Sequence, residues 1–473
     1  MIIMNREHIK TFILTILVIM SIIFTQKIWL YSPINLLKSN STVQETSLEE
    51  IKEIKKQVIM PRSIVVSFGN SYYTKLQQDM EEVWEESKNI LSNYFIADVK
   101  IISSTDEKYQ ENIRLKSIEL EFGKNISSVL VSSIFDTVDN KIVNNIKDIK
   151  KILITTSNKG IIYITEKNNN VYEIKLEKPE GHKQALNLVD NIQARDYIKY
   201  YPLFADVGNY TIMPINYDRT IEKTFVESSI DINDEALTQE KVKPFFNDSL
   251  DFVKTIRETS GALVYMYGYG EKGVRISTKG RLEYSSEKGN ATSTNVLEAL
   301  DTSIKFLLKH EKLPEKLYLQ EVRHQKDKSY FFGFGYKIDE IPVTFNSSNM
   351  KYPIEIEIYG NKVKSYKSFI RNTMNLPKVD SKNPILLPSQ IIEEHIDLIK
   401  SYYLADNIKV ELDEENVLAH IERSIDDVEV LYYDTLEDEK RQLLLPVWKI
   451  QIDKRVYYFD SYNVELLYSH LMD

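Results

Sequence analysis

The first thirty residues constrain this chain more than any other part of the sequence. Residues 11–25 carry no charged side chain, and the apolar pattern resumes at residues 28–31, after Gln26 and Lys27. The uncharged run is shorter than the roughly 20 residues that a helix needs to cross a hydrocarbon core of about 30 Å. Residues 11–30 are long enough if Lys27 extends its ammonium group to the lipid headgroups. We therefore expect a transmembrane helix here.

A removable signal peptide is the alternative, because its apolar core has about this length. Its cleavage site needs small residues such as alanine, and the first alanine of the sequence is Ala97. The sequence contains no cysteine that a lipid could modify. Trp29 and Tyr31 stand where aromatic residues of transmembrane helices meet the membrane surface. These features favour a permanent anchor over a signal peptide.

The charges beside the predicted span indicate its orientation. Arg6 and Lys10 precede it in a short tail, which favours a cytoplasmic N-terminus and places the bulk of the chain outside the cell. Lys27 and Lys38 follow the span and reduce this asymmetry without reversing it. The lack of cysteine is compatible with an extracytoplasmic bacterial protein that does not depend on disulfides. We expect a single-pass protein of the cell membrane.

Composition excludes some classes of function. At 473 residues the chain is long enough for several domains, and 42% hydrophobic residues suffice for folded cores. The formal net charge is −10, whereas nucleic-acid binding requires a basic face. The same charge disfavours simple electrostatic adhesion to anionic polymers or lipids. We expect no nucleic-acid partner.

Hydrophobic periodicity predicts an α+β protein with three extracytoplasmic domains behind the anchor. A helix followed by an antiparallel meander is expected twice, from Asn295 and from Pro388, so that the last two domains are helix-plus-sheet modules. The predicted parts are a cytoplasmic tail and anchor (1–31), a juxtamembrane stalk (32–60), an N-terminal α+β domain (61–181), a β-rich middle domain (182–375) and a C-terminal α+β domain (376–473).

Several individual elements also follow from the pattern. A short helix is predicted from Leu48, where residues 47–50 have capping-box spacing. Longer helices are predicted over residues 72–94 and 388–403. Strands are predicted over residues 408–412 and 417–421.

Two motifs resemble catalytic or cofactor sites but lack the required context. Residues 268–273 match the dinucleotide pattern G-x-G-x-x-G, yet a strand pattern follows where that site needs a helix. Ser348 and Lys351 have the S-x-x-K spacing of penicillin-binding enzymes, but Tyr352-Pro353 ends any helix there. We interpret the two segments as a β-turn and a loop.

Metal and cofactor sites are likewise not predicted. None of the seven histidines occurs in H-E-x-x-H or H-x-H spacing, and no cysteine is available to complete a zinc site. We expect no catalytic residue, no metal and no cofactor.

One face of the predicted span is a candidate contact surface. Small hydroxyl residues on one stripe of a membrane helix allow another helix to approach closely and to form hydrogen bonds. The alternative is that each threonine hydroxyl bonds a carbonyl of its own helix. The residues of this face, spaced by three or four, are Thr11, Thr15, Val18, Ile22, Thr25 and Trp29.

Short segments along the whole chain resemble a known family. They are residues 5–15 leading to Ile28-Trp29, the segment 280–284, and residues 445–450 ahead of residues 457–460. In their order along the chain these segments resemble the YycH (WalH) family of Firmicutes. The closing pair of strands is also similar to YycI proteins and to PepSY-type modules.

The resemblance implies a regulatory function. Members of this family are anchored outside the cytoplasm and act with YycI on the sensor histidine kinase YycG (WalK), which controls cell-wall metabolism through YycF (WalR). It implies membrane-helix contacts and no catalytic residue. Two alternatives remain open at this point: a cell-envelope enzyme, or a secretion chaperone or protease inhibitor that acts outside the membrane.

Overall fold

The computed structural model describes residues 47–178, 181–287, 294–347, 349–374, 376, 384–407, 416–436 and 441–472. The predicted anchor and its contact face lie outside these ranges, as does the strand predicted over residues 408–412. Of the helices within the described ranges, none is both long and apolar enough to cross a membrane.

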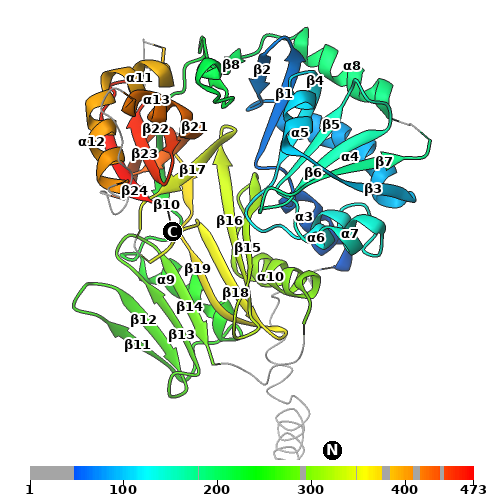
Figure 1. Cartoon of the computed structure of the whole chain (residues 1–473). Coiled ribbons are helices and arrows are strands. Elements are labelled where there is room, and N and C mark those ends of the chain that lie inside the picture. The colour runs from blue at the N-terminus through cyan, green and yellow to red at the C-terminus, as the bar shows by residue number, and fades with distance from the viewer. Residues whose placement is uncertain are drawn as a thin grey trace, which may run out of the picture. The chain divides into compact units, whose positions relative to one another are not determined.

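The N-terminal part is built on a sheet whose strands follow the order β3-β7-β6-β5-β4-β1-β2-β8-β9 (Figure 1). The strands β4 to β7 form a consecutive meander, and β1-β2 and β8-β9 are also consecutive pairs. The remaining neighbours, β3 with β7, β4 with β1 and β2 with β8, are separated in the chain, and every pairing is antiparallel. The strands are β1 (Ser63–Gly69), β2 (Tyr72–Lys75), β3 (Val99–Ser104), β4 (Lys116–Glu121), β5 (Lys151–Thr155), β6 (Ile161–Thr165), β7 (Val171–Leu176), β8 (Tyr200–Tyr201) and β9 (Met213–Pro214).

Alternation along these strands gives the sheet two different faces. One face carries side chains such as Ile64, Leu120 and Ile152, which join the main hydrophobic core with α4 (Met80–Ile96) and α8 (His182–Gln193). The opposite face carries Leu153 and Tyr163, and α5 (Asp106–Ile113) packs on it. The short helices α6 (Ser128–Ser133) and α7 (Lys141–Asn145) lie in the connection between β4 and β5.

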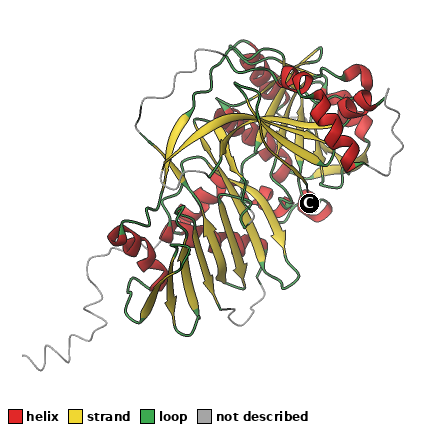
Figure 2. Ribbon diagram, turned by 90° about the vertical axis from the view of Figure 1, so that its left-hand side faces the viewer, coloured by secondary structure: helices red, strands yellow, loops and turns green. Residues whose placement is uncertain are grey.

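The rest of the chain forms a second sheet, in the order β11-β12-β13-β14-β19-β18-β16-β17-β21-β22-β10-β20, with β15 paired to β16 and with β23 and β24 continuing from β22. Figure 2 shows the strands of this sheet in yellow. The strands are β10 (Thr224–Ser228), β11 (Val253–Arg257), β12 (Leu263–Tyr267), β13 (Lys272–Ile276), β14 (Leu282–Ser286), β15 (Leu317–His324), β16 (Tyr330–Ile338), β17 (Ile341–Phe345), β18 (Ile354–Tyr359), β19 (Lys362–Ser368), β20 (Arg371–Thr373), β21 (Ile425–Asp434), β22 (Arg441–Ile452), β23 (Arg455–Asp460) and β24 (Leu466–Leu471).

Helices cover this sheet at two places. α10 (Val296–His310) begins with a complete capping box, in which Asn295 and Glu298 bond each other's backbone amides. It packs on β16, β18 and β19. The remaining helices are α9 (Glu235–Val242), α11 (Pro388–Glu394), α12 (Ile396–Asp406), α13 (Val417–Arg423) and the short 3-10 helices η1 (Ala205–Val207) and η2 (Lys243–Phe246).

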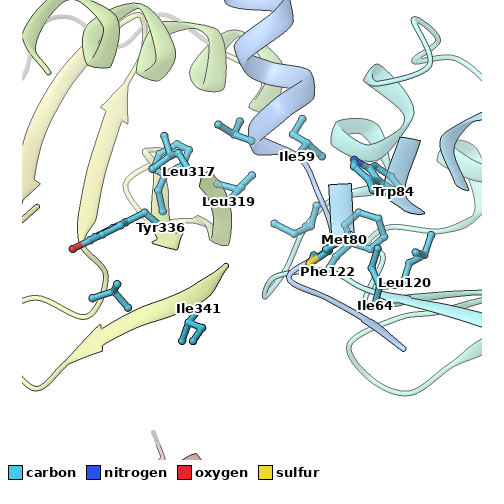
Figure 3. Packing of buried hydrophobic residues seen from close by; sticks show 14 of the residues in the cluster. Ile59, Ile64, Met80, Trp84, Leu120, Phe122, Leu317, Leu319, Tyr336 and Ile341 are labelled. Atoms are coloured by element: carbon cyan, nitrogen blue, oxygen red, sulfur yellow. The ribbon is translucent and has the colours of Figure 1, made fainter. Parts of the chain in front are cut away.

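The two sheets share one hydrophobic core, which begins at α3 (Leu48–Val58). Figure 3 shows Ile59, just after α3, between Trp84 and Phe122 of the N-terminal part and Leu317 and Leu319 of β15. This packing joins the part of the chain that carries the first sheet to the middle of the second sheet.

A backbone contact at Gly123 reinforces this junction. The amide of Lys124 donates to the carbonyl of Gln320 at 2.7 Å, and the amide of Val322 donates to the carbonyl of Lys124 at 3.0 Å. A Cβ atom at Gly123 would lie 2.5 Å from the Gln320 carbonyl oxygen. The two backbones can approach this closely because residue 123 has no side chain.

The α+β class predicted from the sequence is confirmed, and a helix with an antiparallel sheet occurs at both predicted places. α10 accompanies β15, β16, β18 and β19, while α11 to α13 accompany β21 to β24. The division into three domains stays a prediction, and β10 of the predicted middle domain pairs with β22 of the predicted C-terminal domain.

Three element predictions were wrong. Residues 72–75 form β2, because their backbone pairs with β1 in an antiparallel ladder. The helix therefore begins only at Met80. Residues 417–421 are helical, with Val417 and Ile421 buried four residues apart, since a short apolar run does not distinguish a strand from a helix. The helix over 388–403 is interrupted at His395, which separates α11 from α12.

Candidate functional site: a charged cleft between two sheet faces

A cleft of about 1680 Å³ lies between the α5-bearing face of the first sheet and the β21–β24 end of the second sheet. The first sheet contributes charged side chains such as Lys75 and Glu121, and the second contributes Asp427, Glu429 and Lys449. Residues two apart on a strand share a face, which explains why Asp427 and Glu429 of β21 both point into this space. We call it the charged cleft.

Arg62 lies at the centre of an ion-pair network across the charged cleft. Its guanidinium is 2.9 Å from a carboxylate oxygen of Glu121 at the end of β4. The same group is 3.7 Å from Asp427 and 3.8 Å from Glu429, both on β21. One side chain at the start of the first sheet therefore contacts carboxylates of both sheets.

Two lysines complete this network from opposite sides. The ammonium of Lys75, on β2, is 3.6 Å from Asp427 and donates to the carbonyl of Val428 at 3.3 Å. The ammonium of Lys449, on β22, is 3.1 Å from Asp427 and 3.7 Å from Glu429. The three cations and three carboxylates of the network, Arg62, Lys75, Lys449, Glu121, Asp427 and Glu429, therefore balance in charge.

The network shifts the pKa values of its carboxyl groups. Burial alone raises the pKa of Glu121, but the positive charges of Arg62 and Lys151 outweigh it and lower the pKa to about 2. Burial opposes ionisation of Asp427 as well, and Lys449, Lys75 and Arg62 hold its pKa far below the ordinary value. Both carboxyl groups are therefore ionised at neutral pH.

A second buried group of polar side chains adjoins the network on the first sheet. Glu119 accepts a hydrogen bond from the Tyr109 hydroxyl at 2.5 Å and pairs with Lys151 at 2.8 Å. Tyr109 lies on α5, and burial followed by the charge of Glu119 raises the pKa of its hydroxyl well above the usual range. These contacts anchor α5 to the sheet.

The rim of the charged cleft has cations that the network does not compensate. Among the described residues, no carboxylate lies within ion-pair distance of Lys124 or Lys351. Burial, followed by the like charge of Lys351, lowers the pKa of Lys124. The rim therefore carries cations of its own beside carboxylates such as Asp148 and Glu355.

Aromatic side chains line the same face of the second sheet beyond the network. Tyr433, Tyr458 and Tyr468 come from β21, β23 and β24, and the ring centres of Tyr433 and Tyr458 are 5.6 Å apart. Tyr468 stacks on His470 at 5.4 Å. The cleft therefore combines charged groups, hydroxyl groups and aromatic rings, a set of side chains that suits non-covalent binding. Its ion pairs also connect the two sheet faces.

The residues and motifs singled out in the sequence have different outcomes in the structure. Thr11, Thr15, Val18, Ile22, Thr25 and Trp29 lie outside the described residues. The glycine motif at 268–273 is the turn between β12 and β13, as predicted, with φ of 59° at Gly268 and 104° at Gly270. Ser348 also lies outside the described ranges, while Lys351 is in the loop before β18 at the cleft rim. Among the described residues, no group of three or more histidines and carboxylates is placed to hold a metal ion.

Sequence analysis missed the charged cleft, although a signal was present. Charged residues recur two apart at Glu119 and Glu121 and again at Asp427 and Glu429, in strands that are otherwise apolar. A pattern of this kind indicates a strand with one charged face. It does not indicate which distant strand faces it.

Comparison with known proteins finds similar sequences, including a family model that matches the N-terminal part, and a solved structure with a similar fold. Residues 7–194 match the family model for the YycH protein, N-terminal domain. A curated relative, the two-component system WalR/WalK regulatory protein YycH of Bacillus subtilis (strain 168), is 24% identical over 247 residues, which cover 49% of this chain and 52% of the relative. The alignment thus spans about half the length of that relative.

A solved structure extends the likeness to most of the fold. The crystal structure of YycH from Bacillus subtilis matches with a TM-score of 0.55 and 15% identity, covering 87% of this chain and 95% of that chain. At this level of identity the match shows that the two chains share a fold.

Proposed function

We propose that this chain regulates the sensor histidine kinase of a WalR/WalK-type two-component system, as its similarity to YycH proteins suggests. The observation that carries this proposal is the match of residues 7–194 to the N-terminal domain of the family. The description of the Bacillus subtilis relative as a WalR/WalK regulatory protein supports it. A regulator needs no catalytic group of its own, so we propose a function in binding and not an enzymatic one.

The proposed mechanism acts through the membrane. The chain is anchored by residues 11–30 with its N-terminus in the cytoplasm, and the face formed by Thr11, Thr15, Val18, Ile22, Thr25 and Trp29 packs beside a helix of the kinase. A regulator that binds one signalling state of the kinase more tightly than the other shifts the equilibrium between them. A difference of about 1–3 kcal/mol gives a 5–150-fold effect.

The folded part has its own role in this proposal. It lies outside the membrane, binds a YycI-like partner and couples the state of the envelope to the anchor, so that cell-wall metabolism is adjusted. The hydrophobic junction around Ile59 and the ion pairs of the charged cleft support such coupling, because they hold the N-terminal sheet firmly on the second sheet. A rigid body transmits a change at its surface to the helix α3 that leads to the anchor.

Affinity purification from native membranes tests the proposal. The full chain is compared with a version whose residues 1–31 are replaced by an unrelated single-span anchor. We expect the full chain to recover a sensor histidine kinase and the exchanged version to lose it. Recovery of the kinase with both versions would show that the folded part, and not the span, contacts the kinase. Recovery with neither would contradict the proposed function and favour an enzyme or a chaperone of the envelope.

A further inference from the structure

Two aromatic side chains of the second sheet are almost completely exposed. Phe252, just before β11, is 93% exposed, and Tyr269, in the turn between β12 and β13, is fully exposed. An isolated exposed apolar residue is ordinary, but large aromatic rings that leave water gain the most on burial. Two such rings at one place indicate that something covers them.

The strand register brings these rings to one end of the sheet. Val253 of β11 pairs with Tyr267 of β12, so Phe252 and Gly268 continue the same two strands side by side. Tyr267 is itself partly exposed. Figure 1 shows β11, β12 and β13 as neighbours, with β11 at the sheet edge. We call Phe252, Tyr267 and Tyr269 the aromatic tip.

The backbone at the aromatic tip holds the rings outward. Phe252 has φ of 64°, a left-handed conformation that is rare for a bulky residue and costs on the order of 1 kcal/mol or more. Tyr269 stands between Gly268 and Gly270, both with positive φ. Neither ring packs against another described aromatic residue. The backbone strain at Phe252 is not offset by packing of its ring within the folded chain. This combination is characteristic of a contact site.

The charges around the tip nearly balance. Lys254 and Lys272 flank it on β11 and β13, and no carboxylate among the described residues pairs with either. Glu271 in the turn and Glu287 after β14 supply negative charge. The rings, and not a strong field, therefore dominate the chemistry of this surface.

We propose that the aromatic tip inserts into the interfacial region of the lipid bilayer. Tyrosine and phenylalanine rings with lysines beside them are the residues that occupy this region. The inference rests on the proposed function for the anchor. Residues 32–47 between the predicted span and α3 can reach at most roughly 55 Å, which sets an upper limit on the distance between the bilayer and the start of the folded part.

A second attachment to the membrane has a mechanistic consequence. The anchor alone attaches the folded part to the bilayer through a single segment of the chain. With the aromatic tip inserted as well, the orientation of the second sheet relative to the bilayer is fixed, and a change in the folded part can rotate or tilt the anchor.

Quenching by brominated lipids measures this insertion directly. The full chain with Trp29→Phe is reconstituted in bilayers of phosphatidylcholine and phosphatidylglycerol, and Phe252→Trp or Tyr269→Trp is introduced as the probe. Trp84 and Trp448 are buried and contribute a constant background. Ile96→Trp, at another exposed apolar position (68%), is the matched control.

We expect brominated acyl chains to quench the tip probes at least about twofold more strongly than the Ile96→Trp control, since interfacial rings lie at the level of the upper acyl chain. Equal quenching of tip and control would overturn the proposal. A tip probe that is shielded from aqueous iodide but not quenched by the lipids would also overturn it, because a protein would then cover the tip. The readout does not involve the kinase, so it separates this inference from the regulatory function.

Discussion

His310 lies at the end of α10 between aromatic rings, with ring centres 4.0 Å from Phe306 and 4.4 Å from Phe245. Its Nδ1 atom is 2.7 Å from the carbonyl oxygen of Phe306, to which it donates. Burial lowers the pKa of His310 to about 4. The folded protein therefore keeps a neutral imidazole in this core.

This burial predicts a pH dependence. Between pH 6.5 and 4 the unfolded chain takes up a proton on residue 310 and the folded chain does not, so stability falls as pH falls. The expected loss is on the order of 2–3 kcal/mol. Chemical denaturation at several pH values should show a shallower slope in this window for His310→Gln, while the exposed control His324→Gln keeps the wild-type slope. Identical slopes for all three proteins would contradict the burial of a neutral histidine.

Gly123 leads to a second prediction at the residue scale. A methyl group at this position meets the backbone of Gln320, so Gly123→Ala forces the two sheets apart or breaks the bonds between Lys124 and β15. We expect a loss of about 1–3 kcal/mol in the free energy of unfolding, measured in urea. Gly273→Ala is the matched control, because its new Cβ meets neighbours at 3.6 Å or more, in ordinary contact. Equal stability of the two variants would show that the junction tolerates side chains.

At the scale of elements, the ion pairs of the charged cleft couple β2, β4, β21 and β22, together with Arg62 just before β1. The folded pKa of Glu121, about 2, lies below the ordinary carboxyl value, so its contribution to stability is present above pH 4.5 and disappears as pH falls toward 2. Glu121→Gln should lower stability at pH 7 by about 1–3 kcal/mol, and the difference from wild type should shrink over that range.

The matched control for this prediction is Glu82→Gln. Glu82 pairs with Arg195 at 2.7 Å on an exposed surface, where a pair contributes less than about 1 kcal/mol. Denaturation curves at pH 7 and pH 3 measure both variants. A Glu121 effect as small as that of Glu82, or one that persists unchanged at pH 3, would exclude a strong network in the cleft.

Sequence patterns predicted the elements where burial repeats with a clear period. The apolar spacing behind Asn295 was sufficient to predict α10, the spacing of residues 47–50 predicted the start of α3, and the family resemblance is confirmed. Residues 417–421 were misread because five residues do not distinguish a period of 2 from one of 3.6. The charged cleft was not predictable, because Arg62 and Asp427 meet only through long-range packing of the two sheets.

At the scale of the whole molecule, the described residues form a body of two joined sheets, and the predicted membrane anchor precedes this body in the sequence. The junction at Ile59 and Gly123 and the ion pairs around Arg62 hold the sheets together, and α3 connects this body to the segment before it. The match at residues 7–194 covers the predicted anchor and the strands β1 to β7 of the first sheet. In the proposed function, the anchor transmits the signal and the folded body sets the orientation of the anchor.

The central claim is that this chain sets the output of a sensor histidine kinase. The most direct test is the fraction of phosphorylated response regulator in cells that lack the chain, in cells that express it, and in cells that express Thr11→Leu/Thr15→Leu/Thr25→Leu. We predict that removal of the chain changes this fraction, that the full chain restores it, and that the triple variant does not, although it folds and reaches the membrane. An unchanged fraction in cells without the chain would contradict the account.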